Sequence, residues 1–343
     1  ALGPWVTSKS SRKGVWILGS VGQAICAALI AVSALLFDGT TLGISVLILL
    51  AGLALFRAMC SIAGKDVQGR TISKGHRGMI TGRATALGGG FTLAVGLILF
   101  FLPNDLPQWV MAALLALGAS TWALAALVFA GVREPEYETE DNATAHGFGH
   151  MWQLVRTDRD LQKFLLVRSL MLVTALSTPF IVVLAQEQGT DLAGLGAFII
   201  ASGGAALLGG RVSGWWSDKS SKSTMAWAAA TASVVLVLLV LSARLAPESV
   251  NAWVMPLGFF AVNLAHTTVR VSRKTYLVDM ADGDRRTLIT GASNTVMGIM
   301  LLVVGAVNSV IAVLGTQAVL LFLAVLGVCG VFGARNLKEV SAS

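Results

Sequence analysis

The sequence predicts an all-α protein that crosses a membrane many times. About ten apolar runs follow one another along the chain, and each is long enough to cross roughly 30 Å of hydrocarbon. Only 13% of the residues are charged, whereas a soluble domain has about 25%. Glycine is abundant, at 37 residues, as expected where membrane helices pack closely. A large soluble protein is therefore excluded as the leading class.

Each predicted span is an apolar run that ends at charged residues, glycine or proline. The expected ranges are 15–36, 43–63, 81–102, 109–131, 163–185, 192–213, 224–243, 250–270, 287–313 and 317–335. The connections between them alternate between basic and nearly free of basic charge.

Basic residues concentrate in every second connection. They are Lys9, Arg12, Lys13, Lys65, Arg70, Lys74, Arg77, Arg133, Arg156, Arg159, Lys163, Lys219, Lys222, Arg273, Lys274, Arg285, Arg286, Arg335 and Lys338. The opposite side has Arg244 alone. Since positive loops stay in the cytoplasm, we expect both visible termini to be cytoplasmic, in a bacterial-type cytoplasmic (inner) membrane.

Two pairs of segments repeat along the chain. Gly214, Asp218, Lys219 and Lys222 have the same spacing as Pro4, Ser8, Lys9 and Arg12, which lie 210 positions earlier (218 − 8). The segment Arg77–Gly82 likewise matches Arg286–Gly291 at an offset of 209 (286 − 77). Two pairs at nearly one offset predict two homologous halves.

The spacing G-x-x-x-D-[RK]-x-x-[RK] resembles the cytoplasmic signature loop of the major facilitator superfamily, which follows helices 2 and 8 there. The resemblance implies two helical bundles and places the visible spans as helices 3–12. The first two helices would be missing, either because the sequence is a fragment or because the gene is truncated. The implied units are residues 1–131 (helices 3–6 with the end of helix 2), a cytoplasmic linker at 132–162, and 163–343 (helices 7–12).

The linker has two recognisable parts. An acidic run covers residues 134–141, and an amphipathic stretch covers residues 152–160. We expect a solvated connection with a short helix lying on the membrane surface.

The resemblance also implies a gating role for the signature loop. In the family, the matching aspartate, here Asp218, stabilises one closed state, and Gly214 permits close helix packing. Lys219 and Lys222 belong to the same loop. The first copy has Ser8 in place of the aspartate and retains Lys9 and Arg12. The alternative is that these basic residues only fix topology.

Polar residues inside spans are candidates for a substrate cavity, because they are costly in lipid. The resemblance places them on the helix 4, 7 and 10 equivalents, which line the cavity in the family. They are Arg57, Arg168, Thr174, Ser177, Asn263, His266 and Arg270. The last three share one helix face through spacings of three and four. The arginines could instead snorkel to the interface, and His266 could be a satisfied core residue.

No Asp or Glu falls within the ten expected ranges. Proton coupling would therefore use His266, use the missing helices, or be absent.

The expected function is secondary transport of a small solute, with or without a coupling ion. The expected protein is a monomer in the lipid bilayer, without cofactor, metal, nucleic acid or enzymatic activity. Cys26, Cys60 and Cys329 lack metal-ligand spacing. The alternatives are a non-transporting or inactive protein of the same fold and, less favoured, a membrane-embedded enzyme.

Overall fold

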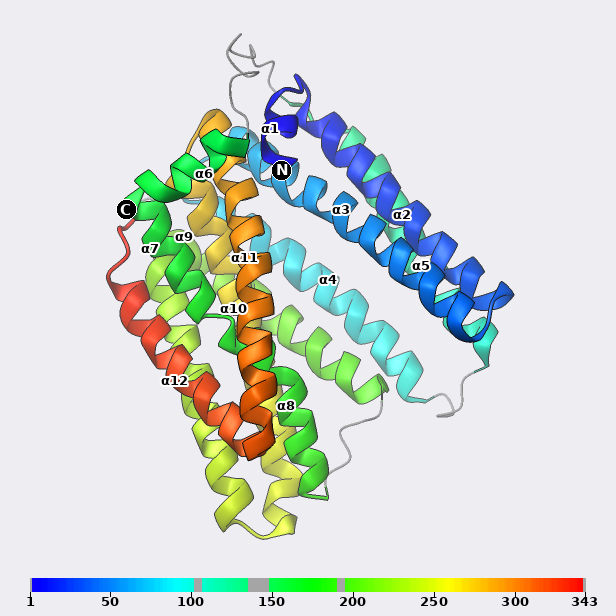
Figure 1. The fold of residues 1–343 in the computed structure, drawn as a ribbon, viewed down its shortest axis with the longest axis vertical. Coiled ribbons are helices and arrows are strands. Elements are labelled where there is room, and N and C mark those ends of the chain that lie inside the picture. Colours follow the sequence, from blue (N-terminus) through cyan, green and yellow to red (C-terminus); the bar gives the residue numbers. More distant parts are fainter. Residues whose placement is uncertain (1, 102–106, 135–147, 190–194, 342–343) are drawn as a thin grey trace. The chain divides into compact units, whose positions relative to one another are not determined.

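A computed structural model describes residues 2–101, 107–134, 148–189 and 195–341, and these residues form helices without strands (Figure 1). The helices are α1 (Leu2–Thr7), α2 (Arg12–Leu36), α3 (Gly39–Thr71), α4 (Arg77–Phe100), α5 (Gln108–Ala130), α6 (Phe148–Thr157), α7 (Arg159–Leu170), α8 (Val173–Glu187), α9 (Leu195–Leu245), α10 (Glu248–Met280), α11 (Gly283–Ile311), the 3-10 turn η2 (Ala312–Leu314) and α12 (Thr316–Arg335).

Nine helical segments of the described residues are long and apolar enough to cross a membrane. The predicted all-α membrane fold is thus confirmed. The difference from the ten expected spans lies in α9, which has 51 residues. A straight helix of that length would extend about 77 Å, more than twice the hydrocarbon thickness.

The chain of α9 reverses direction at Ser220, whose φ of −160° and ψ of 100° are not helical. Before the break, Gly204, Gly209 and Ser217 lie beside Phe260, Leu264 and Ser272 of α10, so the two segments run parallel. After it, Leu239 lies beside Gly258, and Ser242 bonds Asn251, so the segments run antiparallel. The two halves of α9 therefore correspond to the separate spans expected at 192–213 and 224–243.

Contacts divide the chain into two compact units. The first contains residues 1–72, 103–155 and 281–294. In it, α2 packs against both α3 and α5, and α1 packs against α3. The core beside α1 consists of Val6, Val15, Met59, Ile62 and Ala63.

The second unit contains residues 73–102, 156–280 and 295–343. Its centre is α9, which packs against α4, α10 and α12. An apolar core joins α8, α9, α10 and α12 through residues such as Ile181, Leu236, Phe259 and Leu320. Figure 1 shows α4 alongside the first half of α9.

The expected domain boundaries at 131 and 163 follow the sequence repeat, whereas the compact units follow contacts. The two divisions differ at α4, which belongs to the first repeat and packs on α9 of the second. The boundaries from the repeat stay a prediction.

Residues 135–147 lie outside the described residues, and they include all of the acidic run except Glu134. The amphipathic stretch forms α6 and the start of α7. Asp158 separates them and caps α7, since its Oδ1 accepts hydrogen bonds from Asp160 N and Leu161 N, each at 3.0 Å.

Candidate functional site

Asp218 of the second signature loop caps the N-terminus of α4. Its Oδ1 accepts a hydrogen bond from Gly78 N at 2.6 Å, and its Oδ2 accepts one from Met79 N at 2.7 Å. The first amides of a helix have no partner within that helix and carry partial positive charge. His76, at the cap position of α4, makes no side-chain cap bond. A carboxylate from α9 therefore takes the role that a local cap would have.

The contact of Asp218 with α4 depends on glycines in both helices. A Cβ on Gly78 would lie 2.5 Å from the carbonyl oxygen of Gly214. A Cβ on Gly82 would lie 2.2 Å from the carbonyl oxygen of Gly210. Both distances are too short for any side chain. Gly214 thus lies at a close helix crossing, as expected for a small residue at a membrane-helix interface.

The two lysines of this loop make local contacts. Lys219 Nζ lies 3.6 Å from the centre of the Trp215 ring, in a cation–π arrangement. Lys222 Nζ donates a hydrogen bond to the carbonyl oxygen of Leu337, just beyond α12. Neither lysine pairs with an acidic side chain among the described residues.

A buried ion pair lies next to Asp218. Arg77, the first residue of α4, donates from Nη1 to Asp279 Oδ1 at 2.8 Å, near the end of α10. The same nitrogen also bonds the carbonyl oxygen of Val278. Together, Asp218 and Arg77 tie the start of α4 to both α9 and α10.

The first signature loop uses different chemistry, because Ser8 cannot supply a carboxylate. Its hydroxyl bonds the carbonyl oxygen of Trp5 within α1. Arg12 carries the charged contacts instead: its Nε donates to Asp66 Oδ2 at 3.0 Å and its Nη2 donates to Asp284 Oδ1 at 2.8 Å. Lys9 Nζ lies 5.3 Å from the centre of the Trp5 ring, toward solvent.

Asp66 is the centre of this first cluster and is fully buried. Besides Arg12, it pairs with Arg70 at 2.8 Å and with Arg286 at 3.6 Å. Arg286 in turn pairs with Asp282 at 2.8 Å. The cluster stays balanced because Asp282 and Asp284 offset two of the three guanidinium charges. Such a buried network is strongly destabilised by loss of one partner.

These clusters show two features that the sequence did not predict. The helices α3 and α10 extend past the expected ranges 43–63 and 250–270, which contain no Asp or Glu, and the extensions bury Asp66 and Asp279. The first residue of the acidic run also has a structural role. Glu134 accepts hydrogen bonds from Arg12 N at 3.0 Å and Lys13 N at 2.9 Å, and thereby caps α2.

Two of the expected cavity residues meet in the second unit. Thr174 Oγ1 on α8 lies 3.1 Å from His266 Nδ1 on α10. Thr174 and Ser177 are both buried, and the Ser177 hydroxyl has no hydrogen-bond partner among the described residues. Asn263 Nδ2 donates to the carbonyl oxygen of Phe259 in its own helix, at 2.9 Å.

Arginines gather beside this pair. Arg270 and Arg273 lie four and seven residues after His266 on α10 and interact electrostatically with it. Arg273 also interacts electrostatically with Arg168 of α7. The Nε of Arg168 is buried and has no hydrogen-bond partner in the described part of the chain.

The remaining cavity candidate, Arg57, is exposed on α3, which belongs to the first compact unit. The sequence analysis missed Arg273, because it placed this residue in a loop. Its helical spacing from His266 and Arg270 is the signal that could have identified it, since α10 continues to Met280.

In the described ranges, no three His, Cys, Asp or Glu residues are grouped so that they could hold a metal ion.

Comparisons with known proteins agree with this architecture. Residues 1–302 match a family model described as Major Facilitator Superfamily. The chain is similar in structure to the transporter FucP in an outward conformation, with a TM-score of 0.70, 16% identity, and coverage of 98% of this chain and 86% of that one. It is also similar to the human organic anion transporter MFSD10, with a TM-score of 0.70, 14% identity, and coverage of 97% and 79%.

The proton:xylose symporter XylE is a third similar structure, with a TM-score of 0.66, 14% identity, and coverage of 98% of this chain and 82% of that one. Identities this low establish the fold alone. No curated protein matches the sequence. Because the family model covers most of the chain, and the repeated loop and membrane helices agree with it, the chain belongs to the major facilitator superfamily and is a membrane transporter by family.

Proposed function

We propose that the chain is a secondary active transporter that moves a small anionic solute by alternating access. Family membership supports transport but leaves the solute open, because one fold serves many substrates. XylE is a proton:xylose symporter, whereas MFSD10 is an organic anion transporter. The choice between such classes must come from side chains of this chain.

The observation that favours an anion is the cluster formed by Arg168, Arg270, Arg273 and His266. No described carboxylate bonds or pairs with Arg168 or Arg273, and these two charges interact with each other. Like charges held close in a membrane protein are costly unless an opposite charge neutralises them. A carboxylate or phosphate group would do so through charge-assisted hydrogen bonds from guanidinium nitrogens.

Asp218 supports the alternating-access part of the proposal. Two short hydrogen bonds join α9 to the first amides of α4. A contact of this kind can break and form again without repacking a core, so it can stabilise one state of a two-state movement.

We also propose that transport of the solute is coupled to an ion. His266 is the candidate for proton coupling, and it lies among Arg270, Arg273 and Thr174. Uptake measured with and without an imposed pH gradient distinguishes proton coupling from other driving forces.

The test is uptake into liposomes that contain the purified protein. Labelled mono- and dicarboxylates and phosphate esters would be compared with neutral sugars of similar size. We expect uptake of an anion, and Arg168→Gln and Arg273→Gln should each raise its KM about 10- to 100-fold, the effect of losing one hydrogen bond to a charged group. Arg159→Gln is the matched control, because Arg159 is exposed at the start of α7.

Uptake of neutral solutes alone would contradict the anionic class. If the folded wild-type protein transported nothing in the panel or in total metabolite extract, the non-transporting alternative would replace the proposal.

A further inference from the structure

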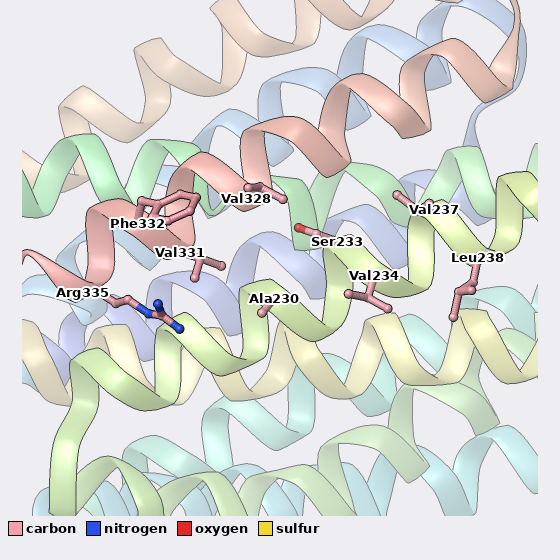
Figure 2. Close-up of a pocket in the computed structure, with 9 residues that line it drawn as sticks. All are labelled: Ala230, Ser233, Val234, Val237, Leu238, Val328, Val331, Phe332 and Arg335. Atoms are coloured by element: carbon pink, nitrogen blue, oxygen red, sulfur yellow. The ribbon is translucent and has the colours of Figure 1, made fainter.

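A groove of about 380 Å³ lies between the second half of α9 and α12 (Figure 2). Its lining residues are Ala230, Ser233, Val234, Val237 and Leu238 from α9, and Val328, Val331, Phe332 and Arg335 from α12. Both helices belong to the second compact unit, so the groove does not depend on how the two units are placed.

The groove is suited to hydrocarbon. Seven of its nine lining side chains are apolar, and Ser233 already donates its hydroxyl proton to the carbonyl oxygen of Ala229. Val234, Leu238 and Phe332 are each more than half exposed. Because α9 and α12 are membrane-crossing helices, the medium that reaches these side chains is lipid.

One end of the groove is positively charged. Figure 2 shows Arg335 at this end and Leu238 at the other. Arg335 is the last residue of α12, is exposed, and makes no ion pair within the described residues. Lys222 bonds the carbonyl oxygen of Leu337 nearby, which adds a second cation at this end.

An apolar groove that ends in cations at the membrane surface matches one kind of molecule. We propose that it binds a phospholipid with an anionic headgroup from the surrounding bilayer. One acyl chain lies between α9 and α12, over a length of about 12 Å from residue 230 to residue 238. The lipid phosphate pairs with Arg335 at the helix end, where basic side chains meet headgroups.

The charge of Arg335 sets the selectivity of the groove for the lipid headgroup. Every membrane lipid offers similar acyl chains, so the apolar lining cannot distinguish one from another. A single arginine near anionic headgroups changes the preference about fivefold.

The test uses the whole protein in nanodiscs made from equal amounts of phosphatidylglycerol and phosphatidylcholine with identical acyl chains. Native mass spectrometry counts the lipids that stay bound. We expect phosphatidylglycerol to be enriched about fivefold. Arg335→Gln should abolish the enrichment, Arg335→Lys should keep it, and Arg159→Gln should leave it unchanged.

Val234→Trp fills the groove from an exposed position and should abolish the enrichment of phosphatidylglycerol. Equal retention of the two lipids by the wild-type protein would overturn the proposal, as would undiminished enrichment in Arg335→Gln. Enrichment that persists in Val234→Trp would also overturn it, because the acyl chain would then lie elsewhere. If Arg335→Gln does not fold, the comparison of the wild-type protein with Val234→Trp still decides.

Discussion

The carboxylate of Asp279 on α10 accepts a 2.8 Å hydrogen bond from Arg77 on α4, and a second arginine–aspartate pair repeats this relationship. Arg286 takes the place of Arg77 in the second copy of the repeated segment, and it lies 3.6 Å from Asp66 on α3. Asp66 precedes Asp279 by 213 positions (279 − 66), close to the offset of the repeat. The two halves thus share this pair although their signature loops differ.

The buried cluster around Asp66 should be essential for the stability of the protein. Asp66→Asn removes a buried carboxylate that contacts three arginines, so the free energy of unfolding should fall by about 3–5 kcal/mol. Asp282→Asn is the control: Asp282 is 77% exposed, and its loss should cost less than about 1 kcal/mol. Unfolding titrations in mixed micelles measure both. Equal losses would contradict the central place of Asp66.

Asp218 should control the rate of transport. Asp218→Asn retains one acceptor oxygen and removes the charge at the α4 N-terminus, which should weaken the contact by about 1–2 kcal/mol and slow uptake about 5- to 30-fold. The protein should still insert and fold. Lys219→Gln should leave uptake unchanged, because the contact that Lys219 makes among the described residues is with the Trp215 ring of its own helix. An Asp218→Asn variant with the parent's uptake rate would show that the contact is not gating.

Two glycines of α4 should respond differently to the same substitution. Gly82→Ala places a methyl group 2.2 Å from the carbonyl oxygen of Gly210, so α4 and α9 must separate. We expect a melting temperature several degrees lower, in line with about 1–3 kcal/mol of overpacking. Gly88→Ala meets nothing within 4 Å and should be neutral or slightly stabilising. Equal shifts for the two variants would argue against the close crossing.

Thr174 and His266 should act as a unit in substrate binding. Thr174→Val and His266→Ala each break the 3.1 Å contact between hydroxyl and imidazole. Each should raise the KM of the transported anion. The double variant should lose less binding free energy than the two single variants lose together, by a coupling energy of about 0.5–1.5 kcal/mol. Uptake kinetics in liposomes for the parent, the two single variants and the double variant give this coupling energy. Strict additivity would mean that the contact has no part in binding.

The charge pattern predicts which connections face the cytoplasm. In a variant without Cys26, Cys60 and Cys329, a cysteine at Lys338 should react with an impermeant maleimide only after cells are opened. A cysteine at Glu248 should react in intact cells. Reaction of both positions, or of Lys338 alone, in intact cells would reverse the predicted topology.

The apolar runs predict an all-α membrane protein, because hydrocarbon thickness sets the length of every span, and the repeated segments predict its two homologous bundles. They could not predict where α3 and α10 end. Both helices continue into the polar region because Asp66 and Asp279 find buried arginine partners there. Such partners come from segments far away in the chain.

The repeated loop indicates that Asp218 is a gating candidate, but only the three-dimensional structure shows that its hydrogen-bond partners are backbone amides of α4. The sequence gives equally little indication that Glu134 caps α2 or that Arg168 interacts electrostatically with Arg273. Each of these relationships joins residues from different helices, and single-sequence periodicity contains no information about them.

The glycine contact between α4 and α9 affects how these helices can move. Gly82 and Gly89 of α4 meet the backbone of α9 at Gly210 and Leu207. Where side chains interdigitate, one helix cannot turn against another without lifting ridges out of grooves. At Gly82 and Gly89 few side chains separate the two backbones, so we expect α4 to roll on α9 with less repacking than an interdigitated interface would need. Asp218 bonds the N-terminal end of α4, so we expect that breaking these two hydrogen bonds would free α4 to turn about its glycine contacts with α9.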